Sequence, residues 1–184
     1  MRVCVFCGSA AGADPAFATV AGDLGRALAR AGIGLVYGGA SVGLMGIVAD
    51  AALAAGGAVT GVIPEALAAR EVAHRRLPDL CIVGSMHERK AMMAGLADAF
   101  VALPGGYGTL EELFEALTWA QLGLHAKPTV ILNAGGYYDA LLSFMDHAER
   151  CGFARPRRPP RLRVAGTVDG VMRALGAPAP TPAA

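Results

Sequence analysis

Short apolar runs alternate along this chain with longer segments in which apolar residues recur every three or four positions. Runs of the first kind are typical of buried strands, and segments of the second kind are typical of amphipathic helices. Glycine and proline mark most of the changes from one kind to the other, as they do at turns. The pattern therefore predicts strands at 2–9, 33–39, 58–64, 80–85, 100–106 and 128–133.

Helices are predicted in the intervals, except that the polar segment 65–77 is interpreted as an irregular crossover. Because the strand runs are apolar throughout, each strand is expected to be buried on both faces, as parallel strands are. This alternation predicts a single-domain, Rossmann-like α/β fold, in which a doubly wound parallel sheet carries helices on both faces. The domain is expected to cover 1–176, with a disordered tail at 177–184. The predicted helices are 14–32, 43–57, 86–99, 109–123, 136–152 and 168–175.

The composition excludes several classes of protein. The chain has 184 residues, 54% hydrophobic and 17% charged, which suits one buried core and excludes a disordered protein. No apolar run reaches the roughly 18 residues of a membrane span, and the apolar start reads as a strand rather than a signal peptide. A cytoplasmic location is therefore expected. The formal net charge of +1 favours neither a nucleic-acid partner nor a membrane surface. The basic run 155–163 is interpreted as a solvated, loosely ordered tail segment.

Cys4 and Cys7 form a CxxC pair, a spacing found in redox and metal sites. Here the pair lies in the first predicted strand, where residues three apart point to opposite faces of the sheet. No second CxxC or histidine pair completes a zinc site. The cysteines, which include Cys81 and Cys151, are therefore expected to be free thiols in a reducing compartment. The histidines have no metal-ligand spacing either, so no metal is expected; they are His74, His87, His125 and His147.

Glycine-rich stretches follow three of the predicted strands, with the sequences CGSAAG, YGGASVGLMG and LPGGYGT. Open parallel sheets bind their ligands outside the carboxyl ends of the strands. Glycine at such a turn lets backbone N–H groups approach a ligand, and the following helix N-terminus adds about half a positive charge. The stretches thus predict an anion site, most often for phosphate. Two familiar nucleotide motifs are excluded, because Ala40 replaces the second glycine of GxGxxG and Leu44 replaces the Walker A lysine.

Two pairs of residues have the S/T-x-x-E spacing of a helix capping box. Thr109 and Glu112 form one pair, and a capping role would explain both residues without any catalysis. Ser85 and Glu88 form the other, and for this pair the capping role is the preferred interpretation.

Arg89 lies on an apolar stripe of its predicted helix, three residues after Met86 and four before Met93. A guanidinium on a core-facing stripe needs an anionic partner, since an unpaired buried charge is strongly destabilising. A carboxylate of Glu111 or Glu112, or a ligand phosphate, would provide one. The pattern alone leaves these partners open.

The stretch SMHERKAMM followed by LPGGYGTLEE closely resembles the paired signatures of the Lonely Guy (LOG) family, whose second motif is PGGxGTxxE. Members of this family are cytokinin riboside 5′-monophosphate phosphoribohydrolases and share their fold with proteins long mislabelled as lysine decarboxylases. The resemblance runs from VCVFCGS to about Gly152, more than four fifths of the chain. One departure is Ala40, since the family commonly has YGGG where this chain has YGGA.

The resemblance implies hydrolysis of the N-glycosidic bond of an adenine-type nucleoside 5′-monophosphate, without a cofactor, by a homodimer with its site near the subunit interface. It implies Arg89 and Glu112 as the catalytic residues. We hypothesise that Glu112 holds the ribose hydroxyls and assists the attacking water, because a carboxylate near C1′ favours an oxocarbenium-like transition state. Arg89 would orient that carboxylate, and the loop 106–109 would hold the 5′-phosphate. The residues expected to contact the nucleotide are Gly8, Ser9, Glu71, Lys90, Gly105, Gly106, Tyr107, Gly108, Thr109, Glu111 and Thr118.

Two other functions compete with hydrolysis. A lysine decarboxylase needs a Schiff-base lysine for pyridoxal phosphate, and neither Lys90 nor Lys127 lies in a suitable context. A non-catalytic carrier of nucleotides or of a molybdenum cofactor would use the same glycine turns on the same fold. The combination of Arg89 and Glu112 favours the hydrolase, since a carrier has no need for both. The sequence leaves open which base is preferred, adenine or an isopentenyladenine type.

Overall fold

The structure of the chain is a computed structural model that describes residues 1–68, 72–154 and 162–177. The described residues form a 7-stranded sheet in the order β4-β3-β2-β1-β5-β6-β7, in which all neighbouring strands are parallel. The strands are β1 (Arg2–Phe6), β2 (Gly34–Tyr37), β3 (Val59–Pro64), β4 (Asp79–Val83), β5 (Ala99–Ala102), β6 (Thr129–Leu132) and β7 (Leu162–Ala165). The helices are α1 (Pro15–Arg30), α2 (Gly43–Ala54), α3 (Glu65–Ala68), α4 (Met86–Leu96), α5 (Tyr107–Gln121), the 3-10 turn η1 (Ala134–Gly136), α6 (Asp139–Arg150) and α7 (Val168–Ala174).

The strand order reverses at β1, which pairs with β2 on one side and with β5 on the other. Val3 of β1, for example, lies opposite Leu35 of β2 and Ala99 of β5. The two halves of the sheet wind outward from this point, which confirms the predicted doubly wound fold. The carboxyl ends of β1 and β5 form the switch point at which such sheets bind their ligands.

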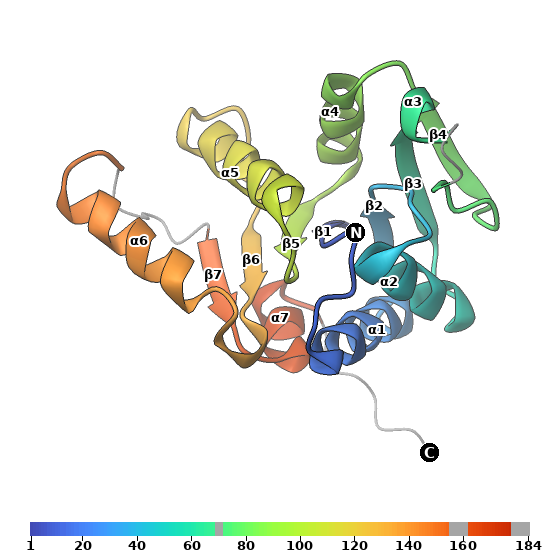
Figure 1. Cartoon of the computed structure of the whole chain (residues 1–184), viewed down its shortest axis with the longest axis horizontal. Coiled ribbons are helices and arrows are strands. Elements are labelled where there is room, and N and C mark those ends of the chain that lie inside the picture. The colour runs from blue at the N-terminus through green and yellow to red at the C-terminus, as the bar shows by residue number, and fades with distance from the viewer. Residues whose placement is uncertain (69–71, 155–161, 178–184) are drawn as a thin grey trace.

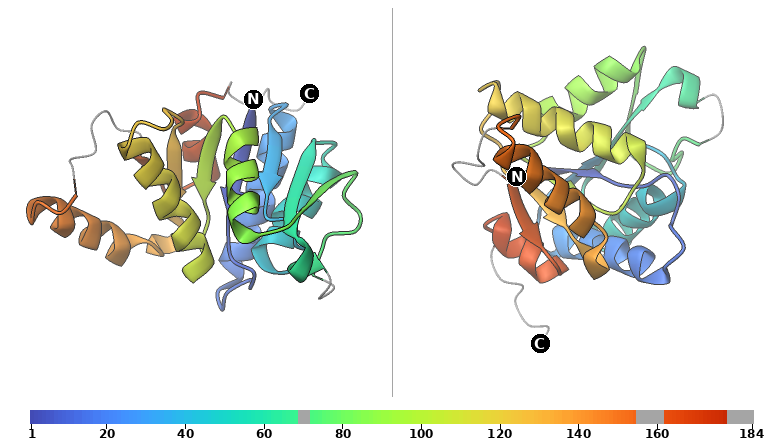
Figure 2. Two further views of the ribbon diagram at one scale, coloured as in Figure 1. Left: turned by 90° about the horizontal axis from the view of Figure 1, so that it is seen from above. Right: turned by 60° about the vertical axis from the view of Figure 1, so that its left-hand side comes forward.

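Helices cover both faces of the sheet (Figure 1). On one face α1, α2 and α7 pack around a core that includes Leu24, Val48 and Val171. On the other face α4, α5 and α6 pack around cores that include Met93 and Leu113. Figure 2 shows that α6 lies at the β7 end of the molecule, away from β4 at the opposite end.

Cys4 and Cys7 belong to the cores on opposite faces of the sheet, as the strand geometry predicts. They are free thiols, like Cys81 and Cys151. Burial raises the pKa of both Cys4 and Cys7 far above neutral pH, so these thiols stay protonated. The CxxC spacing therefore has a packing role in the described structure.

The edge strand β7 corrects the interpretation of the basic run 155–163. Leu162 and Arg163 are the first residues of β7, which pairs with β6 in register. In β7 the side chains of Arg163 and Val164 are exposed, so its sequence lacks the continuous apolar run that identifies the inner strands. Residues 155–161 and 178–184, the latter including most of the predicted tail, lie outside the described residues.

The remaining predicted elements are present, with bounds that differ by a few residues. The short helix α3 occupies the start of the segment 65–77, which the pattern predicted to be irregular. Within the described ranges, no helix has both the length and the apolar character that crossing a membrane requires.

Candidate active site

Three glycine-rich loops meet backbone to backbone at the carboxyl ends of β1, β2 and β5. Gly8 donates its N–H to the Pro104 carbonyl at 3.1 Å, and its carbonyl accepts the Leu44 N–H at 3.0 Å. A Cβ atom at Gly43 would lie 2.3 Å from the carbonyl carbon of Ser9, and Gly43 has a φ of +58°. A side chain at Gly43 would separate the loops, so glycine is required for this close approach.

The N-terminus of α5 begins at Tyr107, earlier than predicted, with Gly106 at the N-cap. Thr109 is therefore inside the helix and buried, and its interpretation as a capping residue is wrong. The Leu110 N–H makes the first backbone bond of the helix, to the Gly106 carbonyl at 3.1 Å. The amides of Tyr107, Gly108 and Thr109 precede it and have no acceptor within the helix. This helix end is consequently suited to bind an anion.

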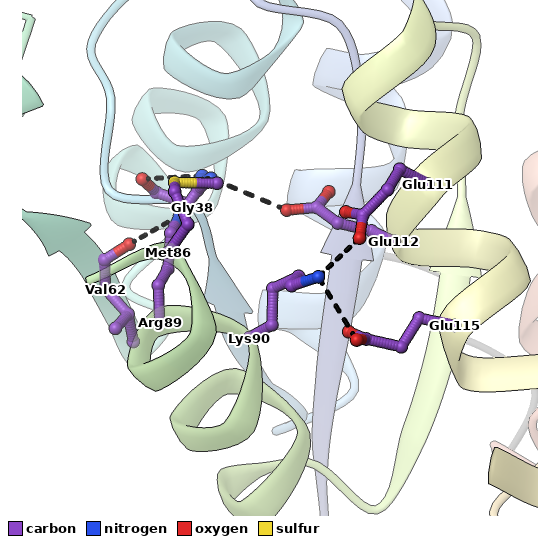
Figure 3. A network of polar contacts seen from close by, with 8 residues as sticks. All are labelled: Gly38, Val62, Met86, Arg89, Lys90, Glu111, Glu112 and Glu115. Carbon is purple, nitrogen blue, oxygen red and sulfur yellow. Dashed lines mark hydrogen bonds and ion pairs between the residues drawn. The ribbon is translucent and has the colours of Figure 1, made fainter.

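Arg89 is buried on α4, with 8% of its surface exposed, as its position in the sequence predicts. Its Nε donates to the Val62 carbonyl and its Nη2 to the Gly38 carbonyl, each at 3.1 Å. A Cβ atom at Gly38 would lie 1.8 Å from Nη2, so only glycine leaves room for the guanidinium. The remaining nitrogen, Nη1, lies 3.6 Å from Oε1 of Glu112 (Figure 3). Glu112 is thus the anionic partner that the sequence left open.

The start of α4 confirms the capping interpretation of the other S/T-x-x-E pair. Ser85 is the N-cap, and its Oγ accepts the Glu88 N–H at 3.1 Å. The Glu88 carboxylate accepts the Gly84 N–H at 2.9 Å. Met86, which was predicted to share the buried stripe with Arg89, is instead 43% exposed. This cap fixes the first turn of α4 and with it the direction in which Arg89 points.

Glu112 has an unusual protonation behaviour for a carboxylate. Its side chain is 11% exposed, and burial raises its pKa from 4.5 to about 7. The attraction of Arg89 lowers the pKa and the repulsion of Glu111 raises it, but burial dominates. A carboxyl group whose pKa lies near ambient pH can accept a proton in one step of a reaction and return it in another.

Lys90, the residue after Arg89, is held by two other carboxylates of α5. Its Nζ donates to Glu111 and, at 3.1 Å, to Glu115 (Figure 3). The hydrogen bond to Glu111 raises the pKa of Lys90, against the effect of burial. Lys90 therefore joins α4 to α5, and it stands outside the group of described residues that line the cavity with Arg89 and Glu112.

A cavity of about 390 Å³ lies at the carboxyl ends of the strands. Arg89, Glu111 and Glu112 line it together with Ser9 and the helix end 106–109. The rest of its wall is apolar and is formed by Val5, Cys7, Ala40, Val42, Met45, Ile63, Leu67, Val72 and Met86, with Gly38. Ligand pockets typically measure about 300–1,000 Å³. The arrangement suits a molecule that carries both an anionic group and an apolar part.

A second cavity of about 240 Å³ shares Ser9 and Gly106 with the first. Gly8 and Gly105, which were expected to contact the nucleotide, line this second space. Tyr137 closes one side, where its hydroxyl donates to the Gly105 carbonyl at 2.7 Å. The glycine loops therefore separate two adjoining spaces.

Among the described residues, two of the predicted contacts, Lys90 and Thr118, line neither cavity. Thr118 is exposed on α5, and Glu71 lies outside the described residues. The carbonyls of Gly38 and Val62 hold Arg89 through the backbone, so no side chain in the sequence indicates this contact. The glycine at position 38 is a possible signal for its own carbonyl contact, because a side chain there would collide with the guanidinium. Across the described ranges, no three His, Cys, Asp or Glu side chains are placed to hold a metal ion.

Comparisons with known proteins identify the family of this chain. The model of a family described as "possible lysine decarboxylase" matches residues 45–175. A cytokinin riboside 5′-monophosphate phosphoribohydrolase of Rhodococcoides fascians is 51% identical over 177 residues, covering 96% of this chain and 89% of that protein. The chain belongs to the Lonely Guy family. A Lonely Guy protein of the same description from Arabidopsis thaliana is 54% identical over 155 residues, covering 84% of this chain and 71% of that protein.

Solved structures that resemble this Lonely Guy protein include molybdenum-cofactor proteins. The carrier protein of Chlamydomonas reinhardtii gives a TM-score of 0.71 at 23% identity, covering 95% of this chain and 94% of that one. The molybdenum cofactor binding protein of Rippkaea orientalis gives the same TM-score and identity. At this identity the likeness shows a shared fold and leaves function to the site.

Proposed function

We propose that this protein hydrolyses the N-glycosidic bond of cytokinin riboside 5′-monophosphates or AMP, and releases the adenine-type base and ribose 5-phosphate. The observation that carries the proposal is that Arg89 and Glu112, with its raised pKa, line one cavity with the N-terminus of α5. Relatives with 51% and 54% identity bear the name of this activity. Water is the second reactant, and we expect no cofactor.

The polar end of the cavity fits the ribose 5′-phosphate. The amides of 106–109 would bind the phosphate, since a helix N-terminus favours a negative charge. Glu112 lies one helical turn beyond Thr109, about 5 Å along the axis of α5, which carries its carboxylate past the phosphate to the ribose. The base would then lie against apolar residues such as Met45 and Val72. This wall also suits an apolar substituent on N6 of the base.

Glu112 would act on the ribose and on the attacking water. Its ionised carboxylate accepts hydrogen bonds from the ribose hydroxyls and stabilises the positive charge that develops near C1′. The water oxygen bonds to C1′ and its proton passes to Glu112, while the electron pair of the C1′–N bond leaves with the base. Arg89 orients the carboxylate and stabilises the negative charge of the departing base, which then takes up the proton from Glu112 and leaves the carboxylate ionised again.

The proposal includes a homodimer in a reducing compartment, the cytoplasm. Phe114 and Thr118 on α5 and Leu122 at its C-cap follow one another at intervals of four, and all three are exposed. Residues at this spacing share one helix face, and Leu122 is 70% exposed. A second copy bound to this face would cover the apolar residues and bring Thr118 toward the nucleotide of the partner subunit. The buried free thiols Cys4 and Cys7 suit a reducing compartment.

Product analysis tests the proposed reaction. The purified protein is incubated with AMP, with isopentenyladenosine 5′-monophosphate, and with the two nucleosides that lack the phosphate, and free base is followed by chromatography. We expect base to be released from the monophosphates and not from the nucleosides, since the phosphate site positions the ribose. The two rates then identify the preferred base. Binding of both monophosphates without release of base would contradict hydrolysis and favour a carrier.

A further inference from the structure

The segment 72–74 borders the active-site cavity and is paired with a glycine loop. The Val72 carbonyl accepts the Ser41 N–H at 2.8 Å, and the His74 N–H donates to the Gly39 carbonyl at 2.8 Å. Between these bonds Ala40 and Ala73 form an antiparallel bridge. The pairing joins two walls of the site, because Val72 and Ala40 both line the cavity.

The same glycine loop carries one of the groups that hold Arg89. The Gly38 carbonyl accepts a hydrogen bond from the guanidinium, and the next residue, Gly39, accepts the His74 N–H. A shift of the segment 72–74 would therefore act first on the wall at Val72 and only indirectly on Arg89. The guanidinium has a second, separate bond to the Val62 carbonyl.

His74 is buried in a way that its place in a polar loop does not explain. The residue is 1% exposed, and its Nε2 lies 3.1 Å from Oδ1 of Asp50 on α2. An ionised carboxylate only accepts hydrogen bonds, so Nε2 carries the hydrogen of this contact. The other ring nitrogen, Nδ1, is buried without a hydrogen-bond partner among the described residues. Because a buried polar group left unpaired is unfavourable, packing alone does not favour a histidine here.

We propose that the contact between His74 and Asp50 fixes the segment 72–74 against the glycine loop, and that both are positioning residues for substrate binding in the hydrolysis proposed above. Asp50 lies on α2, which packs on the sheet independently of the segment. The pair thus ties the cavity wall at Val72 to a rigid element. Neither residue lines the cavity, so the pair acts through the wall and not by contact with the nucleotide.

Asp50 has a second partner that provides a matched control. Arg76 Nη2 lies 2.7 Å from the same Oδ1, yet the Arg76 side chain is 77% exposed and that of His74 is 1% exposed. Exposed ion pairs contribute little, because water and salt screen them. Removing Arg76 therefore deletes a bond to the same carboxylate without releasing the buried segment.

Hydrogen exchange tests the positioning role without any need for catalysis. In His74→Ala and in Asp50→Ala, the amides of residues 41 and 74 should exchange about tenfold faster than in the wild type, since local opening exposes them. Arg76→Ala should leave them unchanged. Asp50 is half exposed on the surface of α2, so Asp50→Ala is expected to fold. This variant can therefore test the proposal even if His74→Ala does not fold. Unchanged protection in Asp50→Ala would overturn the proposal.

Steady-state kinetics tests the consequence for the site. With the monophosphate that the wild type hydrolyses, His74→Ala should raise KM about tenfold and change kcat less than about threefold, because Glu112 and Arg89 keep their other anchors. The amide nitrogen of the glutamine in His74→Gln can replace Nε2 as a donor to Asp50. The KM of His74→Gln should therefore lie close to that of the wild type. A KM in His74→Ala equal to that of Arg76→Ala would overturn the proposal. If the wild type releases no base at all, the proposed function fails, and the exchange rates still decide whether the segment is held by this pair.

Discussion

Two neighbouring cations of α4, Arg89 and Lys90, pair with carboxylates of α5, and the two sets of contacts are built differently (Figure 3). Arg89 faces Glu112 across 3.6 Å, and both side chains are nearly buried, with 10% and 11% exposed. Lys90, the next residue along the helix, donates to Glu111, which is 52% exposed, and to Glu115. The contact of Arg89 is buried and long, whereas Lys90 makes hydrogen bonds to both of its more exposed carboxylates. One pair of helices thus carries one contact suited to chemistry and one suited to holding the helices together.

The difference follows from what each cation is bonded to. The guanidinium of Arg89 makes its shortest contacts with two backbone carbonyls, so it is held in place without closely pairing with Glu112. Burial then outweighs the attraction of Arg89, and the pKa of Glu112 rises to about 7. Lys90 instead directs its ammonium group at its two carboxylates. A carboxylate kept near its titration point and open to a cavity can react, and a tightly paired one cannot.

Replacing Glu112 should have the largest effect. Glu112→Gln keeps the volume of the side chain and removes its ability to take a proton, so kcat should fall about 10³-fold, in the usual range for a general base. Thermal unfolding should show an intact fold, and calorimetry should show that the nucleotide still binds. A turnover near that of the wild type would mean that Glu112 is not the general base. It would then differ from Glu111 only in its burial.

The pH profile should be the next largest effect. Glu112 acts as a base when ionised, so kcat/KM should rise with pH and level off above about 7. Below that value it should fall about tenfold per pH unit. The phosphate of the substrate also titrates, with a pKa of about 6. A profile that bends at the phosphate pKa alone would contradict the raised pKa of Glu112.

Unfolding without substrate separates the two titrations. Between pH 4.5 and about 7 the folded protein keeps a proton on Glu112 that the unfolded chain has lost. Because the folded state binds more protons, the free energy of unfolding should fall as pH rises through this interval. Glu112→Gln has no such proton, so its stability should lack this decline. If the free energies of unfolding of the two proteins changed with pH in the same way, Glu112 would not have the raised pKa that distinguishes it.

The sequence predicts the fold well because each inner strand carries its own signal. Runs such as Val3–Phe6 are apolar at every position, as strands buried on both faces must be, and glycine marks their ends. The edge strand β7 is exposed at Arg163 and Val164, so local composition suggests a solvated segment. Only its pairing with β6 makes it a strand, and that pairing depends on tertiary structure.

The candidate site shows the same division between local and tertiary information. An arginine on an apolar stripe needs an anionic partner, and that reasoning correctly predicts that Arg89 is buried beside a carboxylate. The carboxylate that Arg89 faces depends on how α4 and α5 are rotated relative to each other. The residue spacing within either helix does not determine that rotation. The capping role considered for Thr109 is wrong for a local reason. The N-cap is Gly106, so the helix begins before Thr109.

The smallest effect is expected at Lys90, and it is the most direct test of the contrast between the pairs. Lys90→Met keeps the length of the side chain and removes its charge. Glu111 is already half exposed and can be hydrated, so stability should fall by only about 1 kcal/mol and kcat/KM by less than about fivefold. Lys127→Met is the matched control: Lys127 donates to the Ala94 carbonyl near the end of α4, outside the described lining of the cavity. It removes the same charge and should leave turnover unchanged.

The opposite result for Lys90→Met has a clear meaning. A loss of activity of about 100-fold or more, with unchanged thermal unfolding, would mean that Lys90 leaves its carboxylates and contacts the nucleotide, as the family resemblance implies. Glu111, which lines the cavity, would then be released at the moment of binding. The two ion pairs would no longer divide into a reactive one and a structural one, because both would rearrange around the substrate. Comparable small losses in Lys90→Met and Lys127→Met would instead confine the chemistry to Arg89 and Glu112.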